Sequence, residues 1–175
     1  RRHPEAVTCA SAGIGTAGHL AAELMQATTG IRLTHAPYAS PGQALNDLIA
    51  GRMDIAFDYP LTSLPHVREG RLRALGLTTD RRLPLAPEIP LLGLPGVEML
   101  AWAGLFVPAR TPAGIVATLE AATAAALRDP AAREFFEGTG TLIWAEMGAE
   151  ALGRFLAEEI PRARDLVLRA GLRPG

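Results

Sequence analysis

Cysteine is almost absent from this 175-residue chain, in which Cys9 is the only one. A single cysteine excludes an internal disulfide and a zinc site built from several thiolates. Because Cys9 lies in an apolar stretch with no base beside it in sequence, we expect a buried small side chain rather than a nucleophile. The four histidines form no H-x-x-x-H or H-E-x-x-H pair either. We therefore expect no metal, no cofactor and no enzymatic activity.

The chain also lacks an excess of charge. It has 17 basic and 18 acidic residues, for a formal net charge of −1, and no basic stripe interleaved with aromatic residues. Nucleic-acid binding is therefore not expected. No run of about 18 apolar residues is present, so the sequence predicts no membrane-spanning helix. The stretch that begins at Arg1 does not have the pattern of a signal peptide.

Hydrophobic residues make up 49% of the chain, enough for a domain with its own core. Strand-like and helix-like runs alternate over the first hundred residues, which indicates βαβ units around a mostly parallel sheet. The predicted strands are 7–10, 31–35, 54–58, 72–78, 98–108 and 142–145. The predicted helices are 16–28, 43–50, 112–127, 131–137 and 149–170. Residues 79–97 contain several prolines and are predicted to form a loop.

The most informative stretch is the segment 7–24, an apolar run followed by a turn of small residues and an amphipathic helix. A helix that begins in glycine and hydroxyl residues offers free backbone N–H groups to an anion. Residues 13–18, GIGTAG, also fit the dinucleotide pattern G-x-G-x-x-G. That interpretation needs an acid roughly 20 residues later, but the next strand-like run ends in Ala36-Pro37-Tyr38. The sequence therefore favours a binding site for a carboxylate or a phosphate over a dinucleotide site.

Ligands of parallel α/β sheets bind outside the carboxyl ends of the strands, where three predicted strand ends converge. The predicted ligand-binding residues are Ser11, Gly13, Gly15, Thr16, His19, Tyr38, Ser40 and Asp58. Several keep a structural alternative: Ser11 as a helix cap, His19 as a core hydrogen bond, Tyr38 as a packing aromatic and Asp58 as a turn acid. Ser11 is not in a G-x-S-x-G motif, which argues against a hydrolase nucleophile.

At these residues the chain resembles the extracytoplasmic solute receptors of the tripartite tricarboxylate transporter family, often called Bug receptors. The matching motifs are SAGIGT at 11–16, HLAAEL at 19–24, PY at 37–38, ALNDLIAGRMD at 44–54, GRLRAL at 70–75, LPG at 94–96, WAGL at 102–105, PARTP at 108–112 and AGL at 170–172. Each motif is modest alone, but their order and spacing are specific.

The resemblance implies an α/β fold of the periplasmic-binding-protein type II class, in which two lobes close on a small carboxylate. It implies that residues 1–100 form most of the second lobe, and that 101–175 form a hinge strand and a C-terminal segment returning to the first lobe. The ligand would be a di- or tricarboxylate, an acidic amino acid or an aromatic acid. The implied partners are the two membrane subunits of the transporter, and the implied location is the periplasm.

The chain departs from the family pattern in three places. No counterpart of the N-terminal part of the first lobe, with its glycine-rich loop, lies within these residues, so we expect the chain either to associate with a second copy through the 98–175 region or to aggregate. The family usually has a glycine near Ser40, and a longer segment where this chain has 90–93, PLLG. The alternative functions are the ligand-sensing domain of a bacterial transcription regulator, and a small α/β enzyme that binds phosphate at the glycine turn.

Overall fold

The computed structural model describes residues 7–169 and Gly171. The described chain divides into two compact units. The first comprises the residues up to Ala101 together with those from Ala163 onward, and the second comprises Trp102–Arg162. Ala170, the expected end of the last helix, lies outside the described residues.

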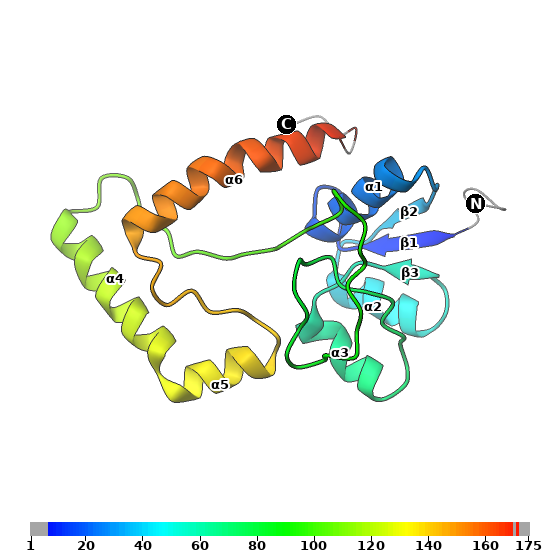
Figure 1. Cartoon of the computed structure of the whole chain (residues 1–175), viewed down its shortest axis with the longest axis horizontal. Coiled ribbons are helices and arrows are strands. Elements are labelled where there is room, and N and C mark those ends of the chain that lie inside the picture. Colours follow the sequence, from blue (N-terminus) through cyan, green and yellow to red (C-terminus); the bar gives the residue numbers. More distant parts are fainter. Residues whose placement is uncertain (1–6, 170, 172–175) are drawn as a thin grey trace. The chain divides into compact units, whose positions relative to one another are not determined.

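A three-stranded parallel sheet lies in the first unit (Figure 1). Its central strand, β1 (Thr8–Ser11), lies between β2 (Thr34–Pro37) and β3 (Ile55–Ala56). The register aligns Ser11 with Pro37 and Ala10 with Ala56. The carboxyl ends of all three strands therefore lie at one edge of the sheet, as the alternation of strands and helices predicts.

Two helices connect these strands. α1 (Ala17–Thr29) joins β1 to β2, and α2 (Pro41–Ile49) joins β2 to β3. Because the two crossovers run in opposite directions along the sheet, the right-handed rule places the helices on opposite faces. The side chains buried in these layers are mostly small, namely Cys9, Ala10, Ala21, Ala22, Leu24 and Ala44. Cys9 is fully buried, as expected, and its burial raises the pKa of the thiol to about 11.

A helix that the sequence pattern does not reveal follows β3. This helix, α3 (Pro60–Arg68), begins with Pro60 in the first turn, where the missing N–H is not needed. Pro65 lies inside the helix and removes one backbone hydrogen bond. Leu64 compensates by packing with Ala86 and Ile89 from the proline-rich segment. The packing of Leu64 thus stabilises α3, although the two prolines of this segment are more typical of a loop.

The strand predicted at 72–78 does not form. Leu77 makes only an isolated bridge with Leu91: its N–H donates to Pro90 O over 2.9 Å, and Leu92 N–H donates to its carbonyl over 2.8 Å. The partner segment is rich in proline, which has no N–H with which to extend a ladder. Residues 72–78 therefore form no ladder, and isolated hydrogen bonds at Leu77 hold them to the proline-rich segment.

The second unit contains helices α4 (Ala113–Arg128) and α5 (Pro130–Gly138) and the first part of α6 (Ala149–Arg169). Asp129 caps α5 as the Asp-Pro pair predicts, because its Oδ1 accepts the N–H groups of Ala131 and Ala132 at 2.9 and 3.2 Å.

The strands predicted at 98–108 and 142–145 do not form. An extended segment becomes a strand only when a neighbour pairs with its backbone, and the described residues 102–162 contain no such neighbour. This unit also has no fully buried side chain among its described residues. Its aromatic contacts include the edge-to-face pairs that Trp102 and Trp144 make with Phe155.

Candidate functional site

The turn between β1 and α1 depends on two glycines. Gly13 has φ +122° and Gly15 has φ +80°, values that favour glycine because it has no Cβ. A Cβ added to Gly13 would lie 3.5 Å from the carbonyl oxygen of Tyr38, whereas one added to Gly15 would meet no atom within 4 Å. Gly13 therefore lies against the loop after β2, and Gly15 faces open space.

The backbone amides of the turn fall into two groups. Gly13 N–H donates to Ser11 Oγ over 3.2 Å, and Gly15 N–H donates to His19 Nδ1 over 3.0 Å. In contrast, the first N–H groups of α1, at Ala17, Gly18 and His19, donate no hydrogen bond to any described part of the chain. The open donors therefore lie just beyond the glycines that the sequence pattern emphasises.

Thr16 contributes to the turn rather than to the cap of the helix. Its hydroxyl donates to Gly13 O over 2.7 Å and makes no capping bond to α1. No acidic residue lies in the first turn of α1. The positive end of the helix dipole is therefore not neutralised by a nearby side chain.

A polar cluster lies at the same strand ends. Ser11 Oγ is 2.7 Å from Nε2 of His35, and the rings of His35 and His19 stack with centroids 4.0 Å apart and an interplanar angle of 10°. Ser11 and His19 are almost fully buried. Burial lowers the pKa of His35, and the neighbouring His19 lowers it further, while Glu23 acts in the opposite direction. His35 was not among the predicted ligand-binding residues, because only the pairing of β1 with β2 places it beside Cys9.

Tyr38 joins the loop after β2 to the turn. Its N–H donates to Ser11 O over 2.9 Å, and its hydroxyl donates to Asp47 Oδ2 over 2.7 Å. Arg52 Nε donates to the other oxygen, Oδ1, over 3.0 Å. These bonds lower the pKa of Asp47, with Arg52 as the larger cause. Asp47 and Arg52 were not among the predicted ligand-binding residues, although both lie in the motif ALNDLIAGRMD at 44–54, five residues apart.

Asp58 follows β3 and begins the approach to α3. Its Oδ2 accepts hydrogen bonds from Thr62 Oγ1, over 2.7 Å, and from Ser63 Oγ. Its other oxygen, Oδ1, accepts none from the described residues. Ser40, before α2, makes no side-chain capping bond. The protein therefore makes hydrogen bonds to only one of the two carboxylate oxygens of Asp58, and Oδ1 can still accept a hydrogen bond from a ligand.

The end of β3 lies very close to α1. A Cβ added to Gly18 would lie 2.6 Å from the carbonyl oxygen of Phe57, which is too short for any real side chain. The missing side chain lets the first turn of α1 approach the strand end next to Asp58. The loops after β1, β2 and β3 thus meet at one edge, as predicted.

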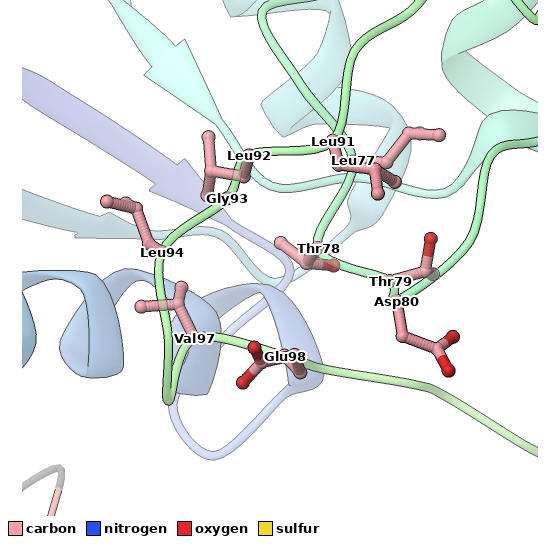
Figure 2. Close-up of a pocket in the computed structure, with 10 residues that line it drawn as sticks. All are labelled: Leu77, Thr78, Thr79, Asp80, Leu91, Leu92, Gly93, Leu94, Val97 and Glu98. Carbon is pink, nitrogen blue, oxygen red and sulfur yellow. The ribbon is translucent and has the colours of Figure 1, made fainter.

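A separate pocket of about 120 Å³ lies in the segments 77–80 and 91–98. Figure 2 shows leucine side chains at one end and the carboxylates of Asp80 and Glu98 at the other. Glu98 accepts the N–H of Gly96 over 2.8 Å. Two carboxylates on its lining disfavour an anionic ligand there, so the glycine turn remains the better anion site.

Residues 7–169 and Gly171 lack two other kinds of site. No group of three or more histidine, cysteine, aspartate and glutamate side chains is arranged to bind a metal ion there. No helix in that part of the chain is long and apolar enough to cross a membrane.

Sequence comparison places these features in a known family. The family model for the tripartite tricarboxylate transporter family receptor matches residues 1–172. A UPF0065 protein of Pseudomonas knackmussii is 39% identical over 162 residues, which cover 90% of this chain and 95% of that protein. A UPF0065 protein of Pseudomonas sp. strain P51 is 36% identical over 172 residues, which cover 96% of this chain and 51% of the relative. The chain thus spans about half the length of this second relative.

Solved structures show the same fold. Rpa4515 of R. palustris with adipate matches all of this chain and 59% of its own, with a TM-score of 0.88 and 28% identity. The periplasmic binding protein BugD matches with a TM-score of 0.88 and 27% identity over 98% of this chain and 59% of its own. MatC of Rhodopseudomonas palustris with bound malate matches with a TM-score of 0.81 and 32% identity over 92% and 56%.

The mixed α/β architecture is therefore that of the periplasmic binding proteins, whose members here are solute-binding receptors rather than enzymes. The resemblance seen in the sequence is confirmed by a family match over nearly the whole chain. On this evidence the chain belongs to the receptor family of the tripartite tricarboxylate transporters.

Proposed function

We propose that this chain binds one carboxylate of a small organic acid at the N-terminus of α1. The observation that carries the proposal is the set of open amides at Ala17 and Gly18, which follow the exposed Gly15. A helix terminus with free N–H groups and no nearby acid attracts an anion, and a glycine lets the ligand approach the backbone.

The ligands of the structural neighbours support this choice of chemistry. Adipate and malate are both dicarboxylates, and the chain aligns with the proteins that were solved with them. We assign to this chain the binding of one end of such a ligand. Residues 1–100 would form most of the second lobe, and residues 101–175 a hinge segment and the return to the first lobe.

The remaining predicted residues take supporting roles in this proposal. Ser11, Gly13 and Thr16 shape the turn through their mutual hydrogen bonds. Ser40 would contribute a hydroxyl at the β2 loop, and Oδ1 of Asp58 would accept an amine if the ligand is an amino acid.

The family membership extends the proposal to partners and location. As the family name implies, a receptor of a tripartite transporter would deliver its solute to two membrane subunits. We propose that this chain works in the periplasm, as the family does, and passes its ligand to such subunits.

Titration calorimetry of the 175-residue chain with malate and adipate tests the proposal. We expect heat of binding for at least one of the acids and none for the corresponding diamides, because amides carry no charge for the helix terminus to attract. Equal binding of acid and diamide, or no binding of either acid, would contradict it. A pull-down with the purified membrane subunits tests the partnership separately.

A further inference from the structure

The hydrogen bonding of the His19 ring indicates which of its nitrogens carries a proton. Its Nδ1 accepts the N–H of Gly15 over 3.0 Å, and a ring nitrogen that accepts a hydrogen bond carries no proton. The proton of the neutral ring is therefore on Nε2. That nitrogen is 3.6 Å from Glu23 Oε1, which is longer than a normal hydrogen bond.

His35 connects the other glycine to the same ring pair. Its Nε2 is 2.7 Å from Ser11 Oγ, which accepts the N–H of Gly13 over 3.2 Å. Both glycine amides of the turn are thus tied to an imidazole, Gly15 directly and Gly13 through Ser11. The two rings stack face to face with their centroids 4.0 Å apart, so each ring limits the positions open to the other.

The stacking of the pair disfavours two charged rings at once. Two imidazolium rings at this distance would repel each other in a site where His19 is buried and His35 is partly buried. Cys9, which β1 places beside His35, is an uncharged thiol because burial raises its pKa. Glu23 on α1 is an acidic group that faces the pair: its Oε1 lies 3.6 Å from His19 Nε2, at the distance of an ion pair if that ring is protonated.

We propose that His19, backed by His35, is a positioning residue for carboxylate capture: as a neutral ring it holds the Gly15 amide inward and leaves the amides of Ala17 and Gly18 as the donors that the ligand meets. The proposal rests on the proposed function and goes beyond it by naming the side chain that orients the turn next to those donors. The turn needs this restraint because its two glycines have wide conformational freedom.

The first experiment compares two variants of His19 by calorimetry with malate and adipate. In His19→Asn the side-chain oxygen can take the place of Nδ1 and accept the Gly15 amide. His19→Leu removes the acceptor. We expect His19→Asn to keep near wild-type affinity and His19→Leu to lose roughly tenfold, since an amide left without its partner reorients or remains unpaired. Equal affinities of the two variants overturn the proposal.

Amide hydrogen exchange of Gly15, measured by NMR, reports the restraint directly. We expect protection in the wild type and in His19→Asn, and fast exchange in His19→Leu. A structural role in the core alone would lower the melting temperature without separating the two variants in Gly15 exchange. Protection of Gly15 that persists in His19→Leu overturns the proposal.

The pH dependence of malate binding by the wild type distinguishes a site with a neutral histidine ring from a site in which a protonated histidine binds the carboxylate. We expect that the affinity for malate does not rise between about pH 8 and about pH 6, where an ordinary histidine gains its proton. The doubly substituted chain His19→Asn with His35→Gln faces the same ligand protonation and serves as the control. An affinity that rises on acidification in the wild type but not in this control overturns the proposal.

The outcomes separate this inference from the proposed function. If the wild type binds neither acid, the proposed function fails, and Gly15 exchange still reports whether His19 restrains the turn. If the wild type binds and His19→Leu binds equally well, the positioning role alone fails. Should His19→Leu not fold, nitrogen NMR of the wild-type rings decides, because a proton on Nδ1 of His19 overturns the inference.

Discussion

The hydroxyl of Tyr38 donates a hydrogen bond to Oδ2 of Asp47 over 2.7 Å. A phenol has one proton, so this hydroxyl cannot at the same time donate to the carboxylate of a ligand. The sequence placed Tyr38 among the ligand-binding residues through its position after a strand. The structure gives its hydroxyl a partner within the protein, and its N–H a second one at Ser11 O.

Replacing Tyr38 with phenylalanine separates these roles. We expect Tyr38→Phe to lower the melting temperature, because Asp47 loses a donor, and to leave the affinity for malate unchanged. A hydroxyl that bonded the ligand would instead cost roughly two- to tenfold in affinity. Calorimetry and a thermal melt of the same preparation distinguish the two results.

Gly15 is the position at which a side chain should interfere with ligand binding. A Cβ there meets no protein atom within 4 Å, so it would occupy the open space through which the ligand approaches. We expect Gly15→Val to abolish measurable binding and Gly15→Ala to weaken it, as calorimetry with malate would show.

The matched control is Gly30→Ala. Gly30 also has a positive φ and open space around it, but it ends α1 at the opposite terminus from the turn. Both alanine variants should therefore lose a similar amount of stability, about 1 kcal/mol. Only Gly15→Ala should lose affinity, and equal affinities for the two variants would refute the site.

Asp58 tests the class of ligand. Its Oδ1 is open, whereas Oδ2 accepts the hydroxyls of Thr62 and Ser63. We expect Asp58→Asn to weaken the binding of glutamate more than that of malate, because only the amino acid offers a positive charge. Equal losses for the two ligands would mean that Asp58 serves only to hold the start of α3.

The stability of the fold should depend on pH through His35. Its pKa in the folded chain is lowered from 6.5, chiefly by burial. Between that lowered value and 6.5 the unfolded chain binds a proton that the folded chain does not. The free energy of unfolding therefore falls as the pH drops through this window and is fully restored above it.

His35→Gln should flatten this part of the profile in chemical denaturation measured from about pH 8 to about pH 5. A second loss is expected at more acidic pH, because the pKa values of Asp47 and Asp54 are lowered from 3.8 by their hydrogen bonds. An unchanged slope in His35→Gln would show that another group governs the first window.

The second unit is expected to associate with another copy of the chain. None of its described side chains is fully buried, and several large apolar ones are exposed. These are Leu105, Phe106, Ile115, Phe135, Leu142 and Ile160. Exposed apolar surface of this kind favours association.

Light scattering after size exclusion at micromolar concentration should give a mass above that of one chain. Phe106→Arg combined with Phe135→Arg should lower that mass, because charged side chains oppose burial of the surface. A stable monomer with a single cooperative melt would contradict the expectation.

Local sequence signals located most elements of the first unit. β1 and α1 lie within about one residue of their predicted bounds, because an apolar run, a glycine turn and the terminal Gly30 are all local signals. α3 was missed because its stability comes from the burial of Leu64. The strands expected at 98–108 and 142–145 were wrong because a strand needs a partner that local sequence does not supply.

By itself the sequence determined the family, the parallel α/β core and the glycine turn. The core and the turn follow from short-range patterns, since backbone freedom at Gly13 and Gly15 and the apolar periods are properties of neighbouring residues. The family was recognised differently, from the resemblance of motifs spread along the chain, and the family match over residues 1–172 confirms it. Only the tertiary structure decided which amides of the turn are open. That outcome depends on the pairing of β1 with β2, which brings His35 to Ser11 and to the ring of His19 from 16 residues away in the chain.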